Sequence, residues 1–423
     1  MRFLKIFIIL TAVVLTSCSD NENAIIWTDR PEFALYGEYF NSVQNQYKVS
    51  VRYTSFPCEE LYNGNGKING SVPDIIAASW LKNSLTGVYF NTLDNLFGSK
   101  NLSRSIFYPR LLAMGRIERK QYLLPVSFNI PALIFSKENE NLVLSNQFTT
   151  DFDEIKKLSA PHNMQQYGAF TRIGFSPLWD NNFLLTAAVL SGASFRESGG
   201  ETPRSVSSTP IAWEASALEQ SMRFINNWTN EINSNSQADD DFTFKYFVEP
   251  KETLIKSRRI LFSFIESDDL FILNEESKNH LDFRWIMDDN KLPVTDSSVY
   301  IGIPVKAKAK KAARAFIQWF FKIENQRRLL EYTRSIRINE NIFGICGGFS
   351  ALTSVTEQVY PVFYPELLGR MPPSENFTLL NILPSNWAII KEQVVLPYLH
   401  DRARAVDVNP LEKRLTDWLR LNR

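Results

Sequence analysis

Short apolar runs alternate with a helical pattern along the chain after residue 23. Residues 24–28 form one apolar run, and residues 33–47 then place an apolar side chain at every third or fourth position, as on one face of an amphipathic helix. Residues 48–53 alternate like a strand, and residues 72–78 form another apolar run. Strand–helix–strand alternation builds a parallel sheet with helices on both faces. The sequence therefore predicts an α/β fold.

The same style of pattern continues to the C-terminus. Residues 121–137 carry two strand-like runs, and residues 308–332 and 384–399 have helical spacing. With 423 residues, 44% of them hydrophobic, the chain is long enough to bury two cores.

The N-terminus has the form of a secretion signal. A basic start at Arg2 and Lys5 precedes a mostly apolar run over residues 6–15, which is too short to span a bilayer. Leu15, Thr16 and Ser17 lead to Cys18, an ending that resembles the lipobox of bacterial lipoproteins. Residues 1–18 are predicted to be a lipoprotein signal peptide whose Cys18 is acylated, for example with palmitate, although an ordinary signal peptide with an incidental cysteine is the alternative.

This interpretation places the protein outside the cytoplasm. Two or more acyl chains anchor a protein stably to a membrane, and the polar residues 19–23 suit a tether. We expect a lipid-anchored protein on a bacterial cell membrane, facing the periplasm or the cell surface. In that compartment Cys58 and Cys346 are allowed to pair, but two unpaired thiols are at least as consistent with the sequence.

Charge and motif content argue against several functions. Lys plus Arg equals Asp plus Glu at 46 each, so no basic excess exists to bind nucleic acid. The three histidines are scattered, and no nucleotide-binding or hydrolase motif occurs. We expect no cofactor, no metal site and no enzymatic activity.

Five segments in order resemble the family 1 extracellular solute-binding proteins of ABC importers, in particular the sugar-binding branch related to maltose-binding protein. They are the run 25–29 with its following helix, Pro73-Asp74-Ile75-Ile76, residues 124–137, residues 256–265, and residues 300–332 with a helix carrying Ala312, Phe316, Trp319 and Gln326. The chain departs from the family where Arg258 and Arg259 replace a glycine-lysine pair, and where Asp296-Ser297-Ser298 replaces glycines.

The resemblance implies a periplasmic-binding-protein-like fold of type II, with two α/β lobes joined by crossing hinge strands. The crossings are expected near residues 130–136 and 285–294. The first lobe is predicted to comprise residues 24–130 plus 294–332, and the second lobe residues 131–293 plus 333–423.

The resemblance and the sequence pattern together suggest a ligand site between the lobes. Aromatic faces can stack on sugar rings while carboxylate, amide and hydroxyl groups bind the hydroxyls. Asp29 could equally be a helix cap, Trp80 a core residue and Glu266 a solvated charge. The predicted ligand-binding residues are Trp27, Asp29, Trp80, Phe128, Asn129, Trp179, Asp180, Glu266, Ser297 and Trp387.

The leading hypothesis is capture of a small solute, with a sugar or oligosaccharide favoured, by a monomer that closes about its hinge and then binds ABC permease subunits. One alternative keeps the fold for a sensor, structural or other non-transport lipoprotein. A less favoured one is a secreted glycoside hydrolase with paired carboxylates.

Overall fold

The computed structural model describes residues 22–63, 72–98, 102–139, 148–198, 210–371, 374–405 and 407–422. The predicted signal peptide, its Cys18 and tether residues 19–21 lie outside these ranges. Every helix within them is too short or too polar to cross a bilayer.

The N-terminal alternation forms the parallel part of a six-stranded sheet. Strand β1 (Asn23–Thr28) lies between β2 (Lys48–Tyr53) and β3 (Ile75–Ser79), and both neighbours run parallel to it. Helix α1 (Glu32–Val43) connects β1 to β2. Phe33, Tyr36 and Phe40 are fully or almost fully buried, so the apolar spacing identified this core-facing side of the helix.

Three antiparallel strands from distant parts of the chain complete this sheet. Strand β16 (Val299–Gly302) pairs with β3 on one side and with β6 (Leu124–Phe128) on the other, and β17 (Phe349–Ser350) pairs with β6. The strand order is β17-β6-β16-β3-β1-β2. Nearby elements of this lobe are α2 (Pro57–Asn63), α3 (Thr86–Tyr89), α4 (Pro109–Met114), β4 (Arg116–Ile117), β5 (Lys120–Gln121), α12 (Lys310–Phe320), α13 (Ile323–Ser335) and α14 (Tyr360–Phe363).

A four-stranded sheet forms the second lobe. Its order is β13-β7-β14-β8, with β13 (Phe262–Glu266), β7 (Pro131–Ser136), β14 (Leu281–Ile286) and β8 (Thr149–Thr150). All six residues of β7 and of β14 are buried, as expected for strands covered on both faces. Around the sheet lie α5 (Phe152–Ser159), β9 (Met164–Gln166), β10 (Ala169–Arg172), α6 (Asn181–Leu190), β11 (Arg196–Glu197), β12 (Ile211–Ala212), α7 (Ala215–Ile232), α8 (Ser236–Tyr246), α9 (Lys251–Lys256), α10 (Ser267–Leu270) and α11 (Glu275–His280).

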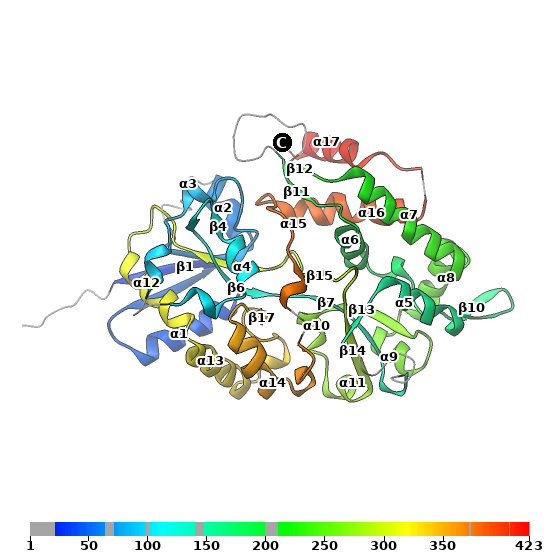
Figure 1. The fold of residues 1–423 in the computed structure, drawn as a ribbon, viewed down its shortest axis with the longest axis horizontal. Helices are drawn as coiled ribbons and strands as arrows, with labels where there is room; N and C mark the ends of the chain where they lie inside the picture. Colours follow the sequence, from blue (N-terminus) through cyan, green and yellow to red (C-terminus); the bar gives the residue numbers. More distant parts are fainter. Residues whose placement is uncertain are drawn as a thin grey trace, which may run out of the picture.

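The chain crosses between the two lobes three times. Strand β6 lies in the first sheet and β7, two residues later, in the second. The chain returns from β14 to β16 through β15 (Leu292–Pro293), which pairs in parallel with β18 (Phe377–Thr378) of the third crossing. Figure 1 shows the lobes on either side of these central strands. The predicted fold, two α/β lobes joined by crossing strands, is therefore confirmed.

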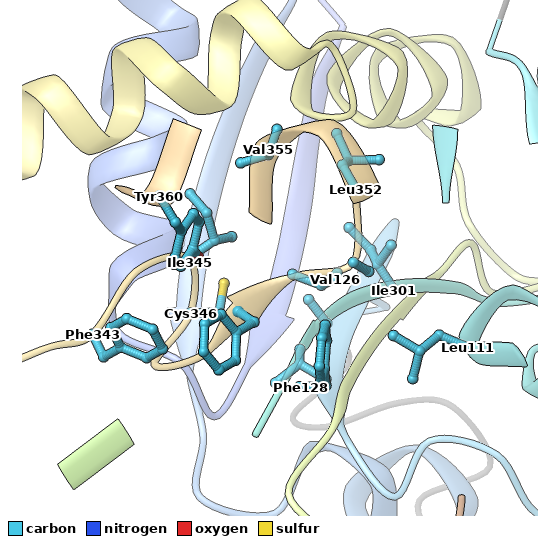
Figure 2. Packing of buried hydrophobic residues seen from close by; sticks show 14 of the residues in the cluster. Leu111, Val126, Phe128, Ile301, Phe343, Ile345, Cys346, Leu352, Val355 and Tyr360 are labelled. Carbon is cyan, nitrogen blue, oxygen red and sulfur yellow. The ribbon is translucent and has the colours of Figure 1, made fainter. Parts of the chain in front are cut away.

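The predicted second lobe differs from the structure after residue 332. Strand β17 joins the first sheet, and Figure 2 shows Phe343, Cys346 and Tyr360 close to Phe128 at the end of β6. The chain enters the second lobe only after β18, where α15 (Trp387–Ile390), α16 (Leu396–Ala403) and α17 (Leu411–Leu421) lie beside α6 and α7. The boundary was missed because residues 343–360 are apolar in a non-periodic way and their partner strand β6 lies more than 200 residues earlier.

Candidate functional site

Polar residues from both lobes and from the crossing strands meet in a crevice, which we call the interlobe crevice. Asp29 and Arg30 follow β1, and Ser79 ends β3. Glu266 ends β13, on the second lobe, and Asp296 follows the β15 crossing. The loops after β1 and β3 gather at one edge of the sheet because parallel strands end together there.

The first lobe contributes a hydrogen-bonded cluster of Asp29, Arg30, Ser79 and Ser297, which we call the polar floor of the crevice. The Arg30 guanidinium donates to Ser79 Oγ at 2.8 Å and to the Ser297 carbonyl oxygen at 3.3 Å. Ser79 Oγ also donates to that carbonyl oxygen, at 2.9 Å. Arg30 Nε lies 3.5 Å from Asp29 Oδ1. Since α1 has no side-chain cap at its N-terminus, Asp29 belongs to this floor and is not a helix cap.

Asn129 links the two lobes at the first crossing. Its side-chain amide donates to the Gly347 carbonyl oxygen at 2.8 Å and accepts from Ser267 Oγ at 2.6 Å. Gly348 lies directly against this crossing, because a Cβ there would be 2.7 Å from the Phe128 carbonyl oxygen. The glycine pair 347–348, which reads in the sequence as a simple turn, therefore lets the first lobe approach the hinge closely.

One end of the crevice is tightly packed around Trp387. This side chain is completely buried, its ring lies 5.8 Å from that of Phe195, and its Nε1 donates to Asp296 Oδ2 at 2.6 Å. Lys391 Nζ lies 3.0 Å from the same carboxylate oxygen. A cavity of about 60 Å³ beside this cluster is lined by Trp80, Lys82, Tyr300 and residues 379–383, among others.

Trp80 bridges the lobes from an unusual backbone conformation. Its φ is 54°, a left-handed value that is strained for a large side chain. It follows β3 of the first lobe, yet its indole packs against the apolar core of the second lobe. The strain therefore accompanies a contact between the lobes.

The second lobe has an open, acidic pocket beside the crevice, and all of its lining residues belong to that lobe. A pocket of about 500 Å³ is lined by residues that include Asp180, Lys251, Glu266 and Asp268. Burial, with the nearby carboxylates of Asp268 and Asp296, raises the pKa of Glu266 to about 8. Burial and the neighbouring Asp269 raise the pKa of Asp268 to about 6. Low solvation disfavours the charged forms of both groups.

Four predicted residues have other surroundings. Trp27 is completely buried beneath the first sheet, with the Arg52 guanidinium 5.4 Å from its ring. Phe128 is buried among Tyr108, Phe349 and Phe377. Trp179 stacks on Phe242 with ring centroids 5.8 Å apart. Trp387 is part of the packed end described above, so Trp27, Phe128 and Trp387 are core side chains in this conformation, and Trp179 is partly buried against the core.

The structure brings Asp29, Trp80, Asn129, Asp180, Glu266 and Ser297 to the crevice. Sequence reasoning missed Arg30, Lys251 and Lys391 as members of the same group. Lys391 lies one helical turn after Trp387, and this spacing could have suggested a shared face. The Lys251 ammonium lies 3.1 Å from the Asp180 carboxylate, although the two residues are 71 positions apart in the sequence. No local sequence pattern predicts that pairing.

Neither a metal nor a disulfide is part of this arrangement in the described ranges. They contain no group of three or more His, Cys, Asp or Glu residues placed to hold a metal ion. Cys58 and Cys346 are free and buried, so the disulfide that the sequence allowed is not formed.

The chain therefore has a two-lobed α/β architecture with strands crossing between its lobes. Several solved structures resemble it. The ABC substrate-binding protein Lmo0181 from Listeria monocytogenes, in complex with cycloalternan, aligns with a TM-score of 0.59 and 15% identity over 95% of this chain and 99% of its own. CpMnBP1 with mannotriose bound aligns with a TM-score of 0.58 and 13% identity over 93% of this chain and 98% of its own.

A third neighbour is the GacH receptor of Streptomyces glaucescens, solved unliganded and with acarbose, which aligns with a TM-score of 0.56 and 13% identity over 95% of this chain and 98% of its own. No family model and no curated protein matches the sequence. At these identities the similarity establishes the fold, which is that of sugar-binding ABC substrate-binding proteins.

Proposed function

We propose that this chain is an extracytoplasmic substrate-binding lipoprotein of an ABC importer, and that it captures a small solute, a sugar or oligosaccharide by preference, in the interlobe crevice. The observation that carries the proposal is that charged groups of both lobes approach one another beside the crossing strands: Arg30 of the first lobe acts on Asp268 of the second, and Glu266 of the second lobe shares a cavity lining with Asp296. Three full-length structural neighbours that bind saccharides support the ligand class.

The mechanism follows from the position of the hinge. A solute that contacts both lobes binds the closed state better than the open one, and closure follows from that difference in affinity. Asn129 lies at the crossing and bonds to Gly347 in one lobe and Ser267 in the other, so it is placed to transmit rotation. Cys18 would hold the protein at the membrane, and ABC permease subunits would bind the closed form. This role requires no cofactor, metal or catalysis.

A panel of mono- and oligosaccharides tests the proposal by thermal unfolding and small-angle scattering. A ligand present at 100 times its Kd stabilises the folded state by about 2.7 kcal/mol, and closure reduces the radius of gyration. We expect at least one saccharide to produce both changes. A panel in which no saccharide shifts the melting temperature contradicts the proposal.

A non-transport binding or sensor lipoprotein on the same fold is a second candidate, and the packed end of the crevice favours it. Trp387 is buried as a core residue, and the two cavities that border Asp296 measure about 60 Å³ and 30 Å³. Neither accommodates a sugar ring in this conformation. Saccharide binding without any change in scattering would support this candidate over the importer.

A further inference from the structure

The cations of the interlobe crevice are already committed to partners. Arg30 lies 3.5 Å from the Asp29 carboxylate, Lys251 3.1 Å from Asp180, and Lys391 3.0 Å from Asp296. Lys82 at the rim donates to the backbone carbonyl oxygens of Met114 and Arg116. These positive charges are therefore neutralised or bonded before any solute arrives.

Three carboxylates of the crevice have no such partner. Glu32, Glu266 and Asp268 form no salt bridge within 4 Å among the described residues. Glu32 is only 4% exposed and its Oε2 has no hydrogen-bond partner. A Cβ on Gly347 would meet Glu32 Oε1 at 3.7 Å and Arg30 Nη1 at 3.9 Å, so this glutamate lies beside the polar floor. Buried acceptors without donors are costly.

These carboxylates are too dispersed for a metal ion but have room for an organic group. In the part of the chain that the structure describes, no three acidic, histidine or cysteine side chains converge on a metal-sized site. Glu266 and Asp268 instead line a pocket of about 500 Å³, which lies within the range of small-ligand sites. Asp269 and Glu252 line the same pocket, and its one lysine is Lys251.

Resting on the proposed function, we propose that the solute bound in the interlobe crevice carries a protonated amine, as an amino sugar does, and that Glu266 and Asp268 receive this ammonium group. An ammonium donates up to three hydrogen bonds and supplies the positive charge that these carboxylates lack. A neutral saccharide supplies no positive charge, so it would not favour the ionised forms of these acidic groups.

Binding of this kind releases protons. Glu266 faces Asp268 on α10, Asp296 at the crossing, Lys391 on the C-terminal helical segment and Asp180 before α6. In this mostly acidic setting its pKa is about 8, so the group is largely protonated at neutral pH. An adjacent ammonium favours the ionised form and lowers that pKa. An N-acetylated sugar of the same shape has no charge to do so.

Calorimetric titration of the purified full-length protein tests the proposal with matched ligands. The panel contains a glucosamine disaccharide, its N-acetylated counterpart, a neutral disaccharide and spermidine, each measured at pH 7 in two buffers that differ in ionisation enthalpy. We expect the amine-bearing disaccharide to bind on the order of tenfold more tightly than its N-acetylated counterpart, with proton release to the buffer.

Glu266→Gln should reduce that preference, and Asp268→Asn is a second variant for the same measurement. Glu276→Gln is the matched control, because Glu276 is an exposed glutamate on α11 paired with Lys256; it should keep the wild-type preference. Equal or tighter binding of the N-acetylated or neutral disaccharide overturns this inference and leaves the proposed function intact. Binding of spermidine alone supports the amine but contradicts the saccharide, and absence of all binding overturns both.

Discussion

The two ends of the interlobe crevice place similar carboxylates in opposite surroundings. Asp296 accepts from the Trp387 indole and is paired with Lys391, and the space around it is nearly filled. Glu266 also lines the smaller of the two cavities that border Asp296, but it has no ion-pair partner among the described residues and it borders the open pocket of the second lobe. Buried polar groups whose hydrogen bonds are all made stabilise the fold. Buried polar groups that lack partners destabilise it, and proteins retain them mainly at functional sites, where a ligand can supply the missing partner. We infer that the Asp296 end provides stability and the Glu266 end provides binding.

The largest effect should come from Trp387→Ala at the packed end. Removing a fully buried indole leaves a cavity and takes one of the two donors from Asp296 Oδ2, so we expect a loss of about 3–5 kcal/mol in the free energy of unfolding. Denaturant titration measures it. Trp418→Ala is the control, because the Trp418 indole donates to Gln393 near the surface of α17 and its loss should cost less. Equal losses would mean that the Asp296 end is not specially stabilising.

Asp296→Ala should produce the next largest effect. Lys391 is only 13% exposed, and the substitution would leave its charge buried without a partner. Breaking such a pair costs about 3 kcal/mol. Glu331→Ala provides the comparison, since Glu331 forms a half-exposed pair with Arg327 one turn away and such pairs contribute about 0.5 kcal/mol or less. If both variants unfold at the same denaturant concentration, the buried pair contributes little.

The third prediction concerns the pH dependence of stability at the open end. The pKa of Glu266 rises from 4.5 in the unfolded chain to about 8 in the fold, so the folded state holds the extra proton. The contribution of Glu266 to stability is then full below about pH 4.5 and is lost as the pH rises through about 8. Glu266→Gln should flatten this decline between about pH 5 and pH 9, leaving the smaller contribution of Asp268.

Thermal unfolding across that pH range measures the slope, and Glu276→Gln should retain the wild-type decline. An unchanged slope in Glu266→Gln would show that Glu266 is ionised and solvated, as an ordinary surface glutamate is. The open end would then lack the uncompensated carboxylate on which the comparison depends.

The sequence contained most of the architecture because the lobes are built from local patterns. The spacing of apolar residues over 33–47 predicted an amphipathic helix, and Phe33, Tyr36 and Phe40 are buried on its core-facing side. Strand β17 was missed because two residues paired with a strand more than 200 positions earlier leave no local periodicity. Pairing between strands that are distant in sequence cannot be predicted from local residue patterns.

The sequence indicated where some polar residues lie but not the environment of their side chains. Asp29 follows a parallel strand, and its place at the strand ends of the sheet depends only on topology; its role in binding stays a prediction. Trp27 and Trp387 were chosen for their aromatic character, yet burial depends on which neighbours cover a ring, here Phe195 for Trp387. The ion pairs of Lys251 and Lys391 join segments that are distant in sequence, so only the folded chain reveals them.

The order of strands in the first sheet has a consequence for synthesis on the ribosome. Strand β6 pairs only with β16 and β17, and both are made after the entire segment from β7 to β14. Until residues 299–302 emerge, the exposed edge of β3 has no neighbour on that side, and unpaired edges favour aggregation. The nascent chain must therefore keep its first sheet unfinished while it builds the second.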